Sequence, residues 1–344
     1  MGTTLADIAS KAGVSQASVS RVINAKPGVS EDLRNTVIDA ITSLGMPVDK
    51  MQRNGTRLIA IVTPNMSNPI FPEFVTEITN LLAQRGFLVI VCSYTPSGTS
   101  EDGYLELLQS QPLAGVIFLG GKYDTKDSNL LIYNTLADRG IPAAFVNGAK
   151  RDMDGIYVST DDALAMTIAL KHLTDLGHRH IGLLLGDRNH FPSIIKHGAA
   201  LEFFARHAIE HGDDMTAWTT YGVESGQMAA RLLIENGATA IACASDELAL
   251  GAIKATRSLG LSIPQDVSVT GYDDSPAMSF MTPSLTTVRQ PVARICLSTI
   301  NALMAMMENK TLTSRRDVIL FEPELIVRES TGRCIRHSAP AVEP

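Results

Sequence analysis

A cluster of small polar, amide and basic side chains near the amino terminus has the chemistry needed to recognise DNA. The cluster comprises Ser15, Gln16, Ala17, Ser18, Ser20, Arg21 and Asn24. Glutamine pairs with adenine and arginine with guanine through two hydrogen bonds each, so we expect base contacts from Gln16, Ala17 and Arg21. The serines and Asn24 suit phosphate oxygens, which fix the register of a protein on the duplex.

Three short helices are predicted to position this cluster. Thr4, followed three residues later by Asp7, is typical of a capping box that starts the first helix. Ser15 is expected to cap a second helix over 16–24, and Ser30 a third. Two helices joined through Gly-Val-Ser are typical of a helix-turn-helix, whose second helix enters the major groove. An ordinary helical hairpin, whose polar residues merely face water, is the alternative interpretation.

Charge is unevenly distributed along the chain, which has 344 residues and a formal net charge of −7 at pH 7. Residues 1–57 contain seven Lys or Arg against five Asp or Glu, a net of +2, so residues 58–344 carry −9. A locally basic segment on an acidic body indicates that only the amino-terminal end meets DNA.

From residue 58 onward the sequence alternates between short apolar runs and helical patterns. The apolar runs predict strands at 58–64, 88–94, 115–121, 143–148, 156–160, 181–186, 240–245 and 267–273. Helical patterns lie at about 72–85, 100–110, 128–139, 161–176, 194–211, 225–236 and 246–259. Strands without polar alternation are buried on both faces, which is typical of α/β folds with parallel sheets. Because a single core rarely exceeds about 250 residues, two lobes are expected, followed by a helix near 291–308 and a strand pair at 318–330.

The amino-terminal motif and five later segments together resemble the LacI/GalR family of transcriptional regulators. The later segments are Gly177–Gly182, Ser245–Gly251, Gly271–Asp274, Leu285–Pro291 and Glu324–Gly332. The resemblance implies a three-helix helix-turn-helix headpiece and a two-lobed core like that of periplasmic binding proteins, with parallel sheets. It also implies a homodimer, or a higher oligomer, that places two headpieces on a palindromic operator in double-stranded DNA. A small effector, a sugar or a nucleoside-like molecule, would bind between the lobes, and we expect the protein to act as a repressor.

The chain is therefore predicted to have four parts. They are a DNA-binding domain at 1–47, a linker at 48–57, an effector-binding and dimerisation core at 58–332, and a tail at 333–344. Within the core, lobe 1 is expected to comprise about 58–159 plus 287–318, and lobe 2 about 160–286 plus 319–332.

Six residues are predicted, from the resemblance, to contact the effector. They are Phe71, Asn147, Lys196, Tyr221, Ser245 and Asp273. A carboxylate such as Asp273 can accept two sugar hydroxyls, and an aromatic ring such as Phe71 or Tyr221 can cover the apolar face of the sugar. For either aromatic residue, packing in the core is the alternative.

The sequence departs from the family in the linker and in the effector cleft. Residues 46–57 are shorter than the usual linker and lack its Ala-Arg-Ser-Leu-like motif. Met51 could replace the leucine that such a motif inserts into the minor groove, or it could cover part of the core. Together with Thr4, Met51 completes the set of residues predicted to contact DNA. Ile195 stands where an arginine is frequent, so Lys196 or Arg188 is expected to replace it. Asn147 stands where many members have aspartate.

Other classes of protein are disfavoured by motifs that the sequence lacks. No G-x-G-x-x-G, G-x-x-x-x-G-K-[ST] or G-x-S-x-G occurs, so we expect neither an enzyme nor a cofactor. A helix-turn-helix fused to a sugar kinase would need an Asp-x-Gly-x-Thr-like loop where this chain has Thr63–Pro69. His207 and His211 are four residues apart on a predicted helix and could bind a metal, but a solvated helix face is favoured because no third ligand lies nearby.

The cellular compartment is inferred from what the sequence does not contain. No segment has about 18 consecutive apolar residues, so no membrane span is expected. Residues 1–13 lack the apolar core of a signal peptide, which argues against a secreted sugar-binding protein. The four cysteines are scattered without a C-x-x-C pair, as suits a reducing compartment, and we expect a cytoplasmic protein.

Overall fold

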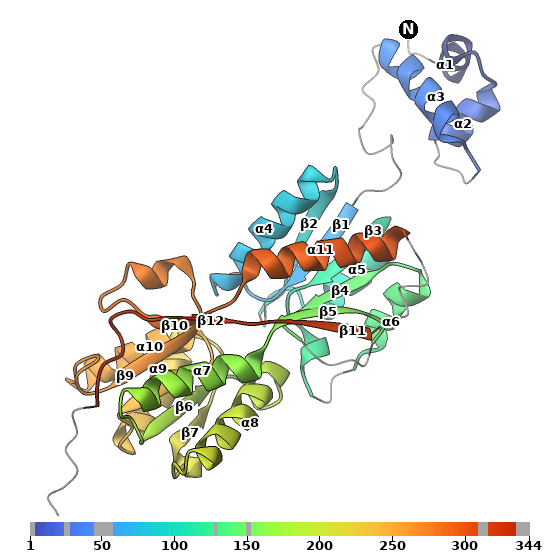
Figure 1. Ribbon diagram of the computed structural model, residues 1–344. Helices are drawn as coiled ribbons and strands as arrows, with labels where there is room; N and C mark the ends of the chain where they lie inside the picture. Colours follow the sequence, from blue (N-terminus) through green and yellow to red (C-terminus); the bar gives the residue numbers. More distant parts are fainter. Residues whose placement is uncertain are drawn as a thin grey trace, which may run out of the picture.

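The computed structural model describes residues 4–23, 28–44, 58–95, 97–126, 129–148, 153–308 and 316–334 (Figure 1). Asn24, Met51 and the predicted linker at 48–57 lie outside the described residues, as does most of the predicted tail. Within the described ranges, no helix combines the length and the apolar character that a membrane span requires.

The amino-terminal domain is the predicted bundle of three helices. These are α1 (Leu5–Ala12), α2 (Gln16–Ile23) and α3 (Glu31–Ser43). The capping box is confirmed: the Thr4 hydroxyl accepts a hydrogen bond from the Asp7 amide at 3.4 Å, and the Asp7 carboxylate accepts one from the Thr4 amide at 2.7 Å. The apolar faces of the three helices meet in one small core, which contains Ile8, Ala9, Val19, Val22, Val37, Ala40 and Ile41. Burial of these side chains on α1 and α3 leaves one face of α2 to the solvent.

Lobe 1 of the core is built on a six-stranded parallel sheet in the order β11-β5-β4-β3-β1-β2. The strands are β1 (Leu58–Thr63), β2 (Leu88–Ser93), β3 (Leu113–Phe118), β4 (Ala143–Val146), β5 (Gly155–Thr160) and β11 (Arg316–Phe321). Side chains alternate between the two faces, and both faces are covered by helices, as the absence of polar alternation predicts. Ile59 and Ile61 pack beneath α4 (Ile70–Gln84) and α11 (Val292–Glu308), whereas Ala60 and Val62 pack towards α5 (Glu101–Gln109) and α6 (Leu131–Asp138).

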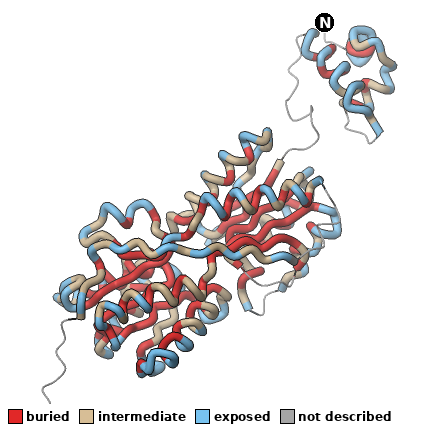
Figure 2. Tube along the Cα trace, viewed as in Figure 1, coloured by how far each residue is buried: buried red, intermediate tan, exposed pale blue. Residues whose placement is uncertain are grey.

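Lobe 2 has a second six-stranded sheet in the order β12-β10-β9-β8-β6-β7, in which only β12 is antiparallel to its neighbour. Its strands are β6 (Ile181–Leu185), β7 (Thr216–Trp218), β8 (Ala240–Cys243), β9 (Ser268–Asp273), β10 (Thr286–Arg289) and β12 (Glu324–Ile326). Two pairs of helices enclose this sheet: α7 (Asp162–Asp175) with α8 (Phe191–Arg206), and α9 (Val223–Glu235) with α10 (Asp246–Ser258). The inner strands of both sheets form the continuous buried regions of Figure 2.

The chain crosses between the lobes three times, after β5, after β10 and after β11. Two of these crossings differ from the expected domain boundaries. β10 belongs to lobe 2, so the second crossing follows Arg289 rather than residue 286, and β11 belongs to lobe 1, so the third follows Phe321 rather than residue 318. The predicted strand pair at 318–330 is therefore wrong, because β11 and β12 lie in different sheets (Figure 1).

Two strands of lobe 2 were absent from the expected set. β7 has only three residues and lies at the sheet edge, where a long apolar run is not needed. β10 contains two buried threonines, Thr286 and Thr287, whose hydroxyls are satisfied by hydrogen bonds with Thr331 and Asp246. A threonine-rich strand of this kind does not produce the apolar run from which the other strands were predicted.

The helix predicted over 194–211 begins and ends earlier than expected. α8 starts at Phe191 and ends at Arg206, and Ala208 has a positive φ of 51° that prevents the helix from continuing. His207 and His211 are consequently not on one helix face. His207 stacks on Phe203 with ring centroids 4.0 Å apart, and the His211 ring shares a 2.8 Å hydrogen bond with the hydroxyl of Thr216.

Candidate DNA-binding surface and effector cleft

The exposed face of α2 carries the predicted DNA-contacting side chains. Ser15, Gln16, Ala17 and Arg21 are exposed, whereas Val19 and Val22, three residues apart, are buried in the headpiece core. Spacing of three to four residues therefore separates a buried stripe from an exposed one on the same short helix. This arrangement agrees with the second helix of a helix-turn-helix.

Several polar residues of the headpiece also have a structural role. The Ser15 hydroxyl caps α2 by accepting a hydrogen bond from the Ser18 amide at 3.0 Å, and the two hydroxyls are 2.9 Å apart. Thr4 is used in the capping box of α1. Ser18 and Ser20 are half-buried. The DNA contacts predicted for these residues, and for Asn24 and Met51 outside the described ranges, stay predictions.

The predicted effector residues of lobe 2 follow the carboxyl ends of its strands. Asp273 ends β9, Ser245 follows β8, and Tyr221 follows β7. Loops at the carboxyl ends of parallel strands are the usual place for a ligand in open α/β sheets. Of these three residues, Ser245 has a clear structural role, because its hydroxyl caps α10 by accepting a hydrogen bond from the Leu248 amide at 3.2 Å.

Asp273 is the carboxylate of this group and is only 5% exposed. Its Oδ1 atom accepts a hydrogen bond from the Gln290 side chain at 2.7 Å. Burial raises the pKa of Asp273 well above its ordinary value, and the nearby carboxylate of Asp246 raises it further. Asp246 is itself buried and has a pKa of about 7 for the same main reason, although Thr287 and the Ser275 amide donate hydrogen bonds to it.

Lys196 is buried, and its ammonium forms an ion pair with Asp162. The same ammonium lies 4.0 Å from the centre of the Tyr272 ring, in a cation–π contact. Lobe 2 therefore already compensates the positive charge of Lys196. The effector contact predicted for Lys196 stays a prediction.

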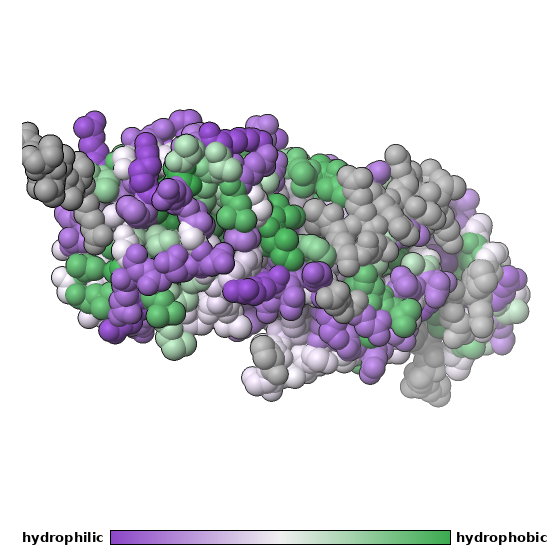
Figure 3. All heavy atoms as spheres, turned by 90° about the horizontal axis from the view of Figure 1, so that it is seen from below, coloured by the Kyte–Doolittle hydropathy of each residue, from purple (hydrophilic) through white to green (hydrophobic). Residues whose placement is uncertain are grey.

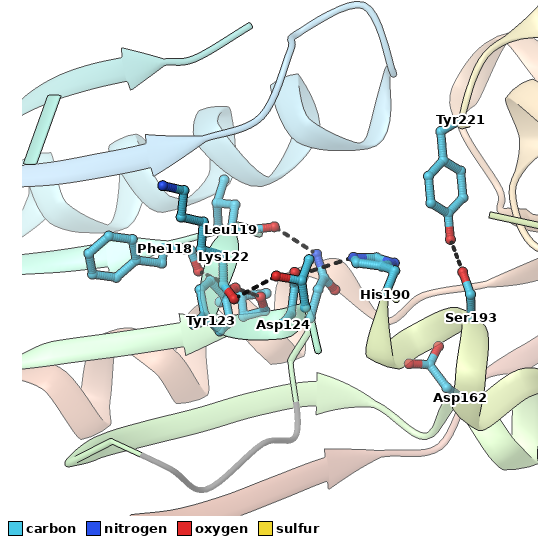
Figure 4. A network of polar contacts seen from close by, with 12 residues as sticks. Phe118, Leu119, Lys122, Tyr123, Asp124, Asp162, His190, Ser193 and Tyr221 are labelled. Carbon is cyan, nitrogen blue, oxygen red and sulfur yellow. Dashed lines mark hydrogen bonds and ion pairs between the residues drawn. The ribbon is translucent and has the colours of Figure 1, made fainter. Parts of the chain in front are cut away.

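Tyr221 lies against the end of β6, where its hydroxyl shares a 3.0 Å hydrogen bond with Ser193 of α8 (Figure 4). A Cβ atom on Gly186 would be 2.4 Å from the Tyr221 ring, so only glycine allows this close approach. The ring also lies nearly perpendicular to that of His190, with centroids 5.7 Å apart.

Lobe 1 contributes Asn147 and the short helical turn Lys122–Asp124 to the same region. Asn147 follows β4, has a positive φ of 69°, and donates a 3.2 Å hydrogen bond from its amide to the Leu119 carbonyl. Asp124 is 2% exposed and forms a 3.2 Å ion pair with His190 of lobe 2 (Figure 4). Phe71 is placed differently: it packs against the α4–α11 side of the lobe 1 core, and no ring contact joins it to Tyr221 within the described ranges.

Four residues near the predicted effector contacts were not identified from the sequence: Asp124, Asp162, His190 and Ser193. These residues come from three separate segments, which meet only in the folded chain: Asp124 from lobe 1, Asp162 at the start of α7, and His190 with Ser193 at the start of α8. Two weak signals were available: His190 and Ser193 follow a predicted strand end, and Asp162 starts a predicted helix. Neither signal identifies the partner residue across the cleft.

Known proteins of similar sequence agree with this geometry. Residues 4–46 match the model described as bacterial regulatory proteins of the lacI family, and residues 170–331 match a periplasmic binding protein-like domain. The HTH-type transcriptional regulator reg1 of Streptomyces lividans is 40% identical over 343 residues, covering 96% of this chain and 97% of that protein. The regulator MalR of Streptomyces coelicolor is 38% identical over 345 residues, with the same coverage of 96% and 97%.

Two solved structures share the whole arrangement of headpiece and core. A lac repressor dimer bound to operator and the anti-inducer ONPF has a TM-score of 0.75 and 25% identity, covering 96% of this chain and 100% of that chain. A complex of the regulator CelR with cellobiose has a TM-score of 0.71 and 26% identity, again covering 96% and 100%.

The fold and the exposed face of α2 define a DNA-binding transcription regulator that joins a helix-turn-helix to a two-lobed core of the periplasmic-binding-protein type. More particularly, the chain belongs to the LacI family of bacterial regulatory proteins. The members of this family regulate transcription and are not enzymes, which confirms the prediction made from the sequence.

Proposed function

We propose that this protein is a cytoplasmic transcriptional repressor whose affinity for a palindromic operator is controlled by a neutral sugar bound between its lobes. The observation that carries the proposal is the contact of Asp124 of lobe 1 with His190 of lobe 2, beside Tyr221 and Ser193, in a chain that also has an exposed recognition helix. A ligand that contacts both lobes can favour one arrangement of them over another, and so can alter how two headpieces are spaced. The cellobiose-bound CelR structure and the lac repressor support this assignment by similarity.

The charges in the cleft favour an uncharged effector over a sugar phosphate. Asp124, Asp162 and Asp273 are all buried in this region, and the ammonium of Lys196 is already paired with Asp162. Because His190 and Lys196 are already paired with Asp124 and Asp162, neither cation is left to balance a phosphate group. Carboxyl groups can accept hydrogen bonds from sugar hydroxyls, and the ring of Tyr221 offers an apolar surface to a sugar.

Two measurements on the purified full chain test this proposal. Binding to fragments of the genomic region around its own gene should weaken steeply with salt, because phosphate contacts release counterions. A thermal-shift screen should then identify a neutral sugar that stabilises the protein, by about 2.7 kcal/mol at 100 times its dissociation constant, and that changes operator affinity. Absence of specific DNA binding, or stabilisation by sugar phosphates alone, would contradict the proposal.

The surface formed by α4, β2 and the turn Pro276–Ser279 is the proposed dimer interface. A groove of about 650 Å³ lies here, lined by α4 residues including Pro72 and Thr76, by Ala277, and by the start of α11. Phe280, which directly follows the turn, is 87% exposed, and the edge strand β2 exposes Leu88 and Val91. On the face of the molecule drawn in Figure 3, hydrophobic and hydrophilic groups are interspersed. Large exposed apolar groups beside an unpaired strand edge are typical of a subunit interface.

Phe280→Asp should therefore weaken dimerisation. An aromatic side chain buried at the centre of an interface contributes about 2 kcal/mol or more, and a two-fold interface contains it twice, so the dimer dissociation constant should rise on the order of 1000-fold. Sedimentation velocity over a concentration series measures this effect. Leu131→Asp is the matched control, because Leu131 is 69% exposed on α6, on the other face of the lobe 1 sheet. Equal dimerisation of the two variants would place the interface elsewhere.

A further inference from the structure

His190 is the only described side chain of lobe 2 that forms an ion pair with a side chain of lobe 1 at the ends of the inner strands, and its second ring nitrogen is unused. We propose that His190 couples effector binding to closure of the lobes: its Nε2 atom holds Asp124 of lobe 1, and its Nδ1 atom binds an oxygen of the sugar. This inference rests on the proposed function, and it adds a specificity-determining residue that the sequence did not indicate.

The contact between the lobes at His190 involves backbone as well as side chains. The Nε2 atom of His190 lies 3.2 Å from Oδ2 of Asp124. Directly beside this pair, the Lys126 amide donates a 2.7 Å hydrogen bond to the Asn189 carbonyl, and Thr125 and His190 form an isolated antiparallel bridge. Residues 124–126 of lobe 1 therefore contact residues 189–190 of lobe 2 through both backbone and side chains. Any effector-dependent movement of one lobe relative to the other must either keep or break this contact.

The Nδ1 atom of His190 is buried and has no hydrogen-bond partner among the described residues. Buried polar atoms are nearly always satisfied in native proteins, so an unsatisfied one indicates a missing ligand or water. The ring itself is held by its ion pair with Asp124 and by its T-shaped contact with the Tyr221 ring (Figure 4). Because these contacts fix its orientation, Nδ1 is directed to the side of the cleft where Tyr221 and Ser193 lie.

The surrounding charges determine which form of His190 is present. Burial and the ammonium of Lys196 disfavour the charged imidazole, but the attraction and hydrogen bond of Asp124, with help from Asp162, outweigh them and raise the pKa of His190. In the charged form both ring nitrogens carry hydrogen, so Nε2 donates to Asp124 while Nδ1 is left as a donor for a sugar oxygen. Sugar affinity should consequently decrease as the pH rises through the pKa of His190.

Two substitutions separate the two halves of this proposal. The amide nitrogen of His190→Gln can occupy the place of Nε2 and donate to Asp124, but nothing replaces Nδ1. The amide of His190→Asn lies near the place of Nδ1, but it is too short to reach Asp124. His180→Gln is the matched control, since His180 is exposed at the opposite end of β6.

The variants are compared in the full chain by isothermal calorimetry with the neutral sugar that stabilises the unchanged protein in a screen of ribose, glucose, maltose and cellobiose. We expect His190→Gln to bind this sugar about 10- to 100-fold more weakly, as for the loss of one hydrogen bond to a charged donor, and His180→Gln to bind normally. His190→Asn should retain more affinity than His190→Gln but should lose the effect of the sugar on operator binding. Equal sugar affinity in His190→Gln and the unchanged protein would overturn the inference.

Failure of the proposed function has a different signature. If none of the four sugars stabilises the unchanged protein, the assigned effector class is wrong, and the contact with Asp124 is tested without ligand by NMR titration of the His190 ring. A pKa above the ordinary histidine value that returns to it in Asp124→Asn supports the bridge between the lobes. An ordinary pKa in the unchanged protein refutes it.

Discussion

Replacing Arg21 by alanine should abolish the preference of this protein for its operator over random DNA. Arg21 is exposed on the face of α2 that lies opposite the buried Val19 and Val22. A two-pronged contact between arginine and guanine contributes about 1–3 kcal/mol of base discrimination. A dimer on a palindrome makes the contact twice, so specificity should fall by roughly 30-fold to 10⁴-fold. Fluorescence anisotropy with operator and scrambled duplexes, at two salt concentrations, measures the change.

A lysine at the same position distinguishes base recognition from simple charge attraction. Arg21→Lys keeps the positive charge but not the planar fork, so it should bind random DNA normally and still fail to select the operator. The Arg21 guanidinium also lies near Gly28, since a Cβ atom there would be 3.4 Å from its Nη2 atom, and the helical content of both variants must therefore be checked by circular dichroism. Unchanged selectivity in Arg21→Ala would assign base recognition to other residues of α2.

Asp273→Asn should remove the response to the effector while the core stays folded. Asparagine can still accept the hydrogen bond that Gln290 donates to Oδ1, so the buried contact is preserved. It cannot accept a sugar hydroxyl with a charged second oxygen, and loss of that bond should weaken sugar binding by about 10- to 100-fold. Calorimetric titration with the sugar, followed by operator binding with and without it, tests both steps. A variant that responds normally would show that Asp273 does not hold the ligand.

The raised pKa of Asp273 predicts how sugar affinity should change with pH. Because burial favours the protonated acid in the empty cleft, a ligand whose hydroxyls require the carboxylate must displace a proton. Sugar affinity should therefore increase with pH on the acid side of its profile, and protons should be released on binding. Asp273→Asn should eliminate this increase, whereas the decrease on the alkaline side, which we assign to His190, should remain. Calorimetry in two buffers of different ionisation enthalpy detects the released protons.

The headpiece could be predicted almost completely because its determinants are local. The capping box of Thr4 and Asp7, the caps at Ser15 and Ser30, and the three-to-four residue spacing of apolar side chains all act within one or two turns of helix. Most of the buried strands, although not the threonine-rich β10, were also visible as apolar runs. These features depend on neighbours in the sequence, so they can be recognised without the structure.

What could not be predicted depends on contacts between distant segments. The sequence contains one polar–apolar pattern over 318–330, yet β11 and β12 separate into two sheets because Glu322 and Pro323 span the distance between the lobes. The ion pair of Asp124 with His190 joins residues 66 positions apart, on loops of different lobes. From the sequence, Lys196 was expected to contact the effector, and only the fold shows that Asp162 forms an ion pair with it.

The three crossings between the lobes determine the order in which the protein can be assembled during translation. The contacts of the headpiece core all lie within residues 8–44, so this domain can fold soon after it leaves the ribosome. The outer strands of the two sheets, β11 and β12, are synthesised after every other strand, and neither lobe is complete before them. A nascent chain therefore carries all the residues of the headpiece core long before it carries all the strands of either lobe.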